Sequence, residues 1–155
     1  MFGSSFIKSN KNDYGRVIEI AREEIGVRET NSPNSGIRVE AYLSYVGFKK
    51  GAPWCAAFIS WVYNKAGFKT PRTAWSPALF PLTKKSTIAQ PGIIFGIYFP
   101  KLKRVGHCGI VESIRDDWIT TIEGNTNAAG SREGDGVYRK VRKKATIHCF
   151  SDWIR

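Results

Sequence analysis

The chain contains the stretch Ala52-Pro53-Trp54-Cys55-Ala56-Ala57-Phe58-Ile59-Ser60-Trp61, in which a cysteine follows Pro-Trp and opens a helical pattern. Apolar residues continue at helical spacing to Ala66, and Gly67 follows them, so a helix is predicted from about Trp54 to Ala66. A thiol in the first turn of a helix faces unpaired backbone N–H groups and the positive end of the helix dipole, which lower its pKa. Cys55 is therefore a candidate nucleophile, although a free cysteine taken alone is more often a buried, inert side chain.

Two shorter helices are predicted before this stretch. Apolar residues recur at helical spacing from Tyr14 to Ile25, where Asp13 can cap the start and Gly26 can end the helix. A second helix is predicted from Ile37 to Val46. Residues 1–12 have the composition of a flexible polar arm, and residues 13–155 are predicted to form a single domain.

The second half of the chain has the shorter apolar runs that are typical of strands. These runs predict strands at Ile93–Phe99, Gly109–Ile114, Trp118–Ile122, Val137–Arg142 and Thr146–Phe150. Helices followed by an antiparallel meander predict an α+β fold, with the N-terminal helices packed on one side of a small curled sheet.

The chain is strongly basic, with 24 Lys and Arg against 13 Asp and Glu and a formal net charge of +11. Five of the six residues from Arg139 to Lys144 are basic. They are either solvated strand edges or a surface that binds a polyanion, such as a nucleic acid, an anionic lipid or a bacterial wall polymer. The aromatic residues lack the spacing of a base-stacking platform, which argues against specific nucleic-acid binding. No apolar run is long enough for a membrane span, and Met1–Lys8 does not resemble a signal peptide.

A cysteine nucleophile needs a base and a polar group that orients the base. His107 lies between glycines at the start of an apolar strand, whereas His148 lies in a terminal strand without glycine, so His107 is the better candidate base. Glu123 ends the next strand of the meander, and Asn125 follows two residues later on the same side. Either side chain can therefore lie near His107, although Glu-Gly-Asn-Thr-Asn is also ordinary turn chemistry.

The three cysteines leave at least one thiol unpaired. The sequence leaves open whether Cys108 and Cys149 form a disulfide. The dipeptides His107-Cys108 and His148-Cys149 each offer one ligand to any one face of a sheet, which is too few for a zinc site. No metal is predicted.

Three segments in this order resemble the CHAP (cysteine, histidine-dependent amidohydrolase/peptidase) family. They are Pro-Trp-Cys-Ala-Ala-Phe (residues 53–58), Gly-His-Cys-Gly-Ile-Val (106–111) and Glu-Gly-Asn-Thr-Asn (123–127), and the similarity runs from about residue 16 to 155. The family belongs to the papain-like NlpC-type superfamily of bacterial cell-wall hydrolases. A cysteine directly after His107 and the basic insertion Pro100–Arg104 are unusual for it.

The resemblance implies that Cys55 is the nucleophile, His107 the general base and acid, and Glu123 the group that orients His107, with Asn125 in the family's second polar position. It implies a papain-like fold, a peptidoglycan or muropeptide substrate and no cofactor. The reaction is then cleavage of an amide, either as an N-acetylmuramoyl-L-alanine amidase or as a stem or bridge endopeptidase. Trp54, Trp75 and Tyr98 are candidates for lining the substrate cleft.

Two other functions stay open. One is a papain-like toxin or effector that acts on another amide, with an immunity or inhibitor protein as its partner. The other is a non-enzymatic basic module that binds a polyanion or the cell wall. For the hydrolase we expect a monomer that acts in the periplasm, at the cell wall or outside the cell, where the basic surface binds an anionic wall polymer.

Overall fold

The computed structural model describes residues 11–155, so most of the polar arm predicted for residues 1–12 lies outside the described residues. Lys11 and Asn12 belong to the first turn of α1 (Lys11–Glu23) and not to the arm. The other two α-helices are α2 (Ile37–Tyr45) and α3 (Cys55–Lys65), close to their predicted positions. Within residues 11–155 no helix has the length and apolar character needed to cross a membrane.

The second half of the chain forms one antiparallel sheet with the strand order β1-β6-β2-β3-β4-β5. Strands β2 to β5 form the predicted meander. The predicted closing strand, β6, leaves the meander and pairs with β2 instead. The strands are β1 (Lys85–Ser86), β2 (Ile94–Phe99), β3 (Arg104–Arg115), β4 (Trp118–Thr126), β5 (Gly136–Lys143) and β6 (Cys149–Ser151). Two 3-10 turns, η1 (Ser76–Leu79) and η2 (Leu82–Lys84), lie between α3 and β1. Two more connect strands, η3 (Pro100–Leu102) between β2 and β3 and η4 (Lys144–Thr146) between β5 and β6.

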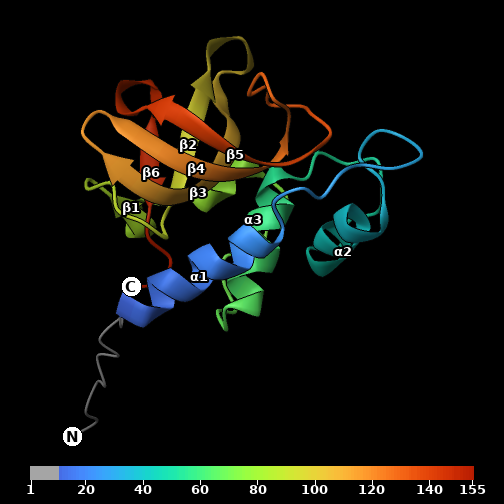
Figure 1. Ribbon diagram of the computed structural model, residues 1–155, viewed down its shortest axis with the longest axis horizontal. Coiled ribbons are helices and arrows are strands. Elements are labelled where there is room, and N and C mark those ends of the chain that lie inside the picture. Colours follow the sequence, from blue (N-terminus) through green and yellow to red (C-terminus); the bar gives the residue numbers. More distant parts are fainter. Residues whose placement is uncertain (1–10) are drawn as a thin grey trace, which may run out of the picture.

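The three helices lie on one side of the sheet, which confirms the α+β class with its N-terminal helical layer (Figure 1). Helix α3 packs against β3 and β4 on one side and against α1 and α2 on the other. All of its residues from Cys55 to Tyr63 are buried. Burial on every side explains why its sequence is apolar all round, with no polar face. The helix that carries Cys55 is therefore held rigidly between the sheet and the other helices.

Strands β3 and β4 are longer than their sequence pattern predicted, because glycines interrupt the apolar runs. Each glycine leaves room for a close neighbour. A Cβ on Gly109 would lie 2.8 Å from Glu123 Cγ, and one on Gly124 would lie 2.8 Å from Phe58 Cβ on α3. The extended strands place His107 inside β3 and Glu123 inside β4. Both side chains are therefore fixed by paired backbone, not carried on loops.

Candidate active site

Cys55 is the first residue of α3, and Asn125 on β4 holds the backbone just before it. The buried Asn125 amide is satisfied at both ends when Nδ2 donates to Gly134 O (3.1 Å) and Oδ1 accepts the Trp54 N–H (3.2 Å). Asn125 has a left-handed backbone, with φ of 55°. The sequence analysis named this residue, with Glu123, as one that can lie near His107. In the structure its amide contacts the start of α3, where it ties the helix to the sheet.

The thiol of Cys55 is buried and surrounded by three groups that favour its charged form. Its Sγ lies 3.4 Å from Ser76 Oγ, and the same hydroxyl lies 3.8 Å from Cys108 Sγ. Hydrogen bonding from Cys108, together with His107 and Ser76, outweighs burial and holds the pKa of Cys55 well below its usual range. Burial and the neighbouring Cys55 raise the pKa of Cys108, so Cys108 stays protonated and can donate its S–H to a Cys55 thiolate.

His107 is fully buried between Cys55 and Glu123. Its Nε2 lies 2.8 Å from Glu123 Oε2, while Nδ1 makes no geometrically ideal hydrogen bond within residues 11–155. Burial alone would lower the pKa of His107, but hydrogen bonds and charge interactions with Cys55 and Glu123 outweigh it and raise the pKa to about 9. Both pKa shifts favour a thiolate on Cys55 and an imidazolium on His107. Helix α3 and strands β3 and β4 together bring close the three residues that the sequence analysis named as nucleophile, base and orienting group.

Glu123 has two further partners that the sequence analysis missed. Arg142 on β5 donates to both carboxylate oxygens at 2.6 Å each, and Thr121 Oγ1 donates to Oε1 at 2.5 Å. Burial would raise the pKa of Glu123, but Arg142 and His107 outweigh it and lower the pKa to about 2. The carboxylate therefore stays ionised while it accepts from the imidazole. Nothing in the sequence separates Arg142 from the other cations of its basic run.

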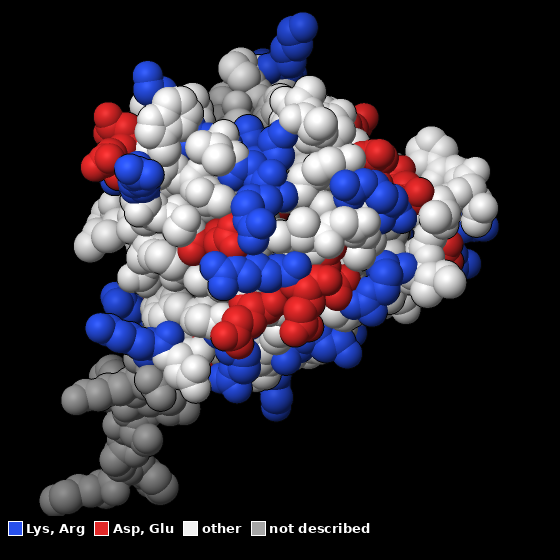
Figure 2. Space-filling view, in the orientation of Figure 1, with Lys and Arg blue, Asp and Glu red and all other residues white. Residues whose placement is uncertain are grey.

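The basic run on β5 is partly neutralised by buried or half-buried acids. Arg139 binds Glu112 through two hydrogen bonds, and Arg22 on α1 binds the same carboxylate. Arg142 binds Glu123, whereas Lys143 and Lys144 are exposed. Figure 2 shows acidic side chains lying among basic ones on one face, not a uniformly positive surface. A large part of this charge therefore serves the fold and the site.

The remaining cysteine, Cys149, does not pair with Cys108, and all three thiols are free. Cys108 and Cys149 lie opposite the same residue, Gly96, on the two strands that flank β2. Two strand spacings separate their backbones by about 10 Å, which is beyond the reach of a disulfide. Within residues 11–155, no three His, Cys, Asp or Glu side chains are grouped in a way that could hold a metal ion.

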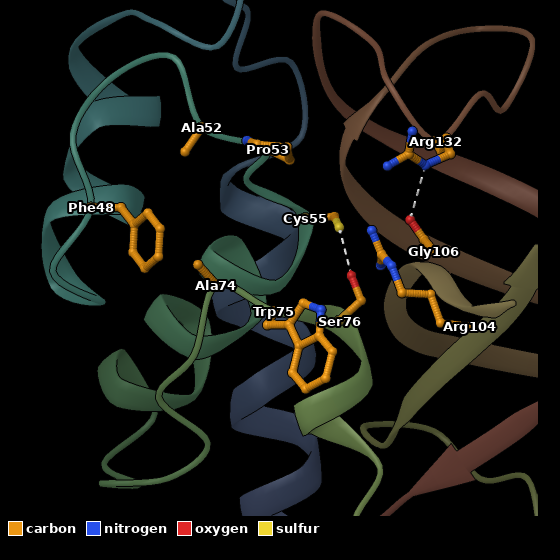
Figure 3. A pocket seen from close by; sticks show the side chains of 10 residues that line it. All are labelled: Phe48, Ala52, Pro53, Cys55, Ala74, Trp75, Ser76, Arg104, Gly106 and Arg132. Atoms are coloured by element: carbon orange, nitrogen blue, oxygen red, sulfur yellow. Dashed lines mark hydrogen bonds between the residues drawn. The ribbon is translucent and has the colours of Figure 1, made fainter. Parts of the chain in front are cut away.

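A cleft of about 200 Å³ opens beside Cys55 (Figure 3). Trp75, one of the three aromatic residues named in the sequence analysis, is 59% exposed and lines this cleft. Trp54 does not line it, because the indole is fully buried, stacks on Tyr42 and donates to Glu29 Oε1 at 2.8 Å. Tyr98 does not line it either, because its ring packs beside His148 with centroids 5.0 Å apart.

The sequence analysis did not recognise several polar and aromatic residues of the cleft. Ser76 opens η1 and contributes its hydroxyl beside Cys55. Phe48, Arg104 and Arg132 come from three separate loops or strand ends, and they line the cleft only because the fold brings these segments together. Sequence signals pointed to two of these residues. Ser76 stands before a proline, and Arg132 lies in a Gly-rich loop, but both features are common in ordinary turns.

The family model described as the CHAP domain matches residues 47–125, which is about half of the chain. The matched region contains Cys55, His107, Glu123 and Asn125, and it ends before Arg132 and Arg142. Comparison with curated proteins and with solved structures found no match. The match and the α+β architecture place this chain in the CHAP domain family, whose members are in general cysteine amidohydrolases or peptidases that act on the cell wall.

Proposed function

We propose that this protein hydrolyses an amide bond of peptidoglycan through a Cys55–His107–Glu123 thiol mechanism. The scissile bond is either the amide between muramic acid and L-alanine or an amide within the stem or bridge peptides. The observation that carries the proposal is the buried His107 ring between Cys55 and Glu123, with Nε2 held 2.8 Å from the carboxylate. Family membership supports the class of reaction and its location at the cell wall.

In the first half-reaction the Cys55 thiolate attacks the carbonyl carbon of the substrate amide. The C–N bond breaks as the His107 imidazolium gives its proton to the departing amine, leaving a thioester on Cys55 and a neutral imidazole. Negative charge develops on the carbonyl oxygen in the transition state. Backbone N–H groups in the first turn of α3 have no intrahelical acceptor, so they are suited to stabilise this oxyanion.

In the second half-reaction water cleaves the thioester. The neutral imidazole of His107 takes a proton from the attacking water, and the product carboxylic acid leaves as Cys55 returns to the thiolate. Glu123 keeps the imidazole in the tautomer and orientation that both steps need, and it stabilises the imidazolium electrostatically. Arg142 and Thr121 hold that carboxylate in place.

Digestion of purified sacculi tests this proposal, with released muropeptides measured by mass spectrometry. Wild-type protein should release them, and the Cys55→Ala variant should not. A Cys149→Ala variant is the matched control, because that thiol lies outside the cleft and should leave release unchanged. Equal release by wild type and Cys55→Ala would contradict the proposal. Product masses from defined muropeptides identify the scissile bond.

A further inference from the structure

The cleft beside Cys55 has two chemically different walls. Apolar side chains, among them Phe48 and Trp75, form one wall. On the other side of Cys55 lie Arg104, the first residue of β3, and Arg132, from the loop between β4 and β5 (Figure 3). A substrate whose carbonyl reaches Cys55 therefore passes between an apolar surface and two guanidinium groups.

Both arginines are anchored to the backbone next to the candidate base. Arg104 Nη1 donates to Val105 O at 2.9 Å, and Arg132 Nε donates to Gly106 O at 3.4 Å. These carbonyls belong to the two residues directly before His107. Each guanidinium is thereby positioned relative to the reaction centre, although it extends from a strand end or a loop.

The two guanidinium groups keep donors free. Arg104 forms no ion pair within residues 11–155, and only its Nη1 donates a hydrogen bond there. Arg132 pairs through Nη1 with the exposed Glu133 at 2.6 Å, and its Nη2 donates no hydrogen bond within the same residues. Arg139 and Arg142 differ, because each binds a buried carboxylate through two hydrogen bonds.

The charges elsewhere in the site are already balanced in pairs. The Cys55 thiolate faces the His107 imidazolium, and Glu123 faces Arg142. The cationic wall therefore remains available to a ligand. A guanidinium binds a carboxylate through two parallel N–H donors, and such charge-assisted bonds are about twice as strong as neutral ones.

We propose that Arg104 and Arg132 form a carboxylate subsite, which selects peptides with a free carboxylate close to the scissile amide. This inference rests on the proposed hydrolysis at Cys55. In a peptidoglycan stem the matching groups are the carboxylates outside the amide chain, such as the α-carboxylate of a γ-linked glutamate. Amidation would remove the charge and one acceptor oxygen while it keeps the size, so an amidated stem should be a poorer substrate.

A matched set of synthetic muropeptides tests the subsite. Each member has one free carboxylate of the stem converted to a carboxamide. For at least one position, the wild-type kcat/KM should be about 10–100-fold higher for the carboxylate than for the carboxamide, as expected for a charge-assisted hydrogen bond. In the double variant Arg104→Gln/Arg132→Gln, the kcat/KM values for the carboxylate and carboxamide forms should lie within about threefold of each other. The change should come mainly from a higher KM for the carboxylate form.

Two further variants separate the subsite from general charge effects. Arg115→Gln removes an exposed cation at the opposite end of β3 and should keep the wild-type preference. Arg104→Lys retains the positive charge but lacks the planar guanidinium. It should keep only part of the wild-type preference for the carboxylate form. Circular dichroism and thermal melts establish that each variant is folded.

Binding of the same muropeptides to the Cys55→Ala variant distinguishes the two possible failures. If wild type releases muropeptides but discriminates by less than threefold at every position, the subsite is overturned and the proposed hydrolysis stands. If wild type cleaves nothing, the proposed hydrolysis fails. The subsite then stands only if Cys55→Ala binds a carboxylate form at least tenfold more tightly than its carboxamide, and it is overturned otherwise.

Discussion

Arg142 binds both oxygens of the Glu123 carboxylate from β5, while His107 contacts the same carboxylate from β3 on the other side. Glu123 is fully buried in β4, between these two strands. A buried carboxylate without a cationic partner would be protonated or would bind the imidazolium in a different geometry. The arginine therefore positions the group that orients the proposed base.

The change Arg142→Gln should lower kcat by about 10–1,000-fold with little effect on KM, because Glu123 loses its bidentate partner and no longer fixes His107. The pH profile of kcat should also shift, since the pKa of Glu123 would rise from about 2. Steady-state kinetics on a defined muropeptide over a range of pH measures both effects. A purely structural role would leave the pH profile in place.

Arg139→Gln is the matched control for this change. Arg139 lies on the same strand and also binds a carboxylate through two hydrogen bonds, but its partner is Glu112. The variant should cost stability without altering the pH profile of kcat. Equal effects of the two substitutions on that profile would contradict the role of Arg142.

Alkylation of Cys55 should depend only weakly on pH. The pKa of Cys55 lies well below its usual range and the pKa of His107 is raised to about 9, so both shifts favour the thiolate at neutral pH. Its iodoacetamide rate constant should therefore fall much less from pH 8 to pH 6 than that of an ordinary cysteine, which would fall about 50–100-fold. Mass spectrometry of modified peptides measures each cysteine separately.

Cys108 and Cys149 provide the internal comparison, because burial raises both of their pKa values, that of Cys149 to about 11. They should react far more slowly than Cys55 at neutral pH. The variant His107→Ala should restore a steep pH dependence at Cys55. Three cysteines that react at one slow rate in the folded protein would disprove the proposed thiolate.

Acid should destabilise the protein through Glu123. Its pKa falls from an ordinary 4.5 to about 2 on folding, so its stabilisation is present above pH 4.5 and is lost as the pH falls toward 2. The loss should be on the order of 3 kcal/mol in the free energy of unfolding, measured by urea denaturation between pH 5 and 2. The Glu123→Gln variant should lose stability less steeply over this range, and a parallel profile would contradict the assignment.

Asn125 should matter through the start of α3. In Asn125→Gly the new residue tolerates the left-handed backbone, but both amide hydrogen bonds are lost. The variant should therefore lose about 1–3 kcal/mol of stability and have a lower kcat. Asn125→Ala should cost about 1 kcal/mol more, because it adds backbone strain. Urea denaturation and muropeptide kinetics measure the two effects. Wild-type behaviour of Asn125→Gly would remove Asn125 from the site.

Gly109→Ala should displace the orienting carboxylate. The added methyl would lie 2.7 Å from the Phe95 ring and 2.8 Å from Glu123 Cγ, so Glu123 or the strand must move. We expect a loss of about 1–3 kcal/mol in stability together with a lower kcat. Gly15→Ala in α1 meets nothing within 4 Å and should instead stabilise the protein by about 0.5–1 kcal/mol. Equal activity of the two variants would contradict the close packing at Gly109.

The sequence predicted the fold class and the three helices because their signals are local. Apolar periodicity predicted both ends of α2 and of α3 to within one residue. The strand-like runs predicted the β2–β5 meander. Strand ends were less predictable, because Gly106, Gly109 and Gly124 carry no apolar signal. Their role is to let a neighbour approach, and this becomes visible only when the neighbour is in place.

By itself, the sequence determined the order of thiol, imidazole and carboxylate along the chain, since Cys55 opens a helix and His107 and Glu123 lie on consecutive strands. Only the tertiary structure decided that Asn125 holds the start of α3, that Trp54 belongs to the core and that Arg142 holds Glu123. The physical reason is register. Which side chains meet across a curled sheet depends on strand pairing and bulges, and these contacts join residues that the local pattern cannot relate.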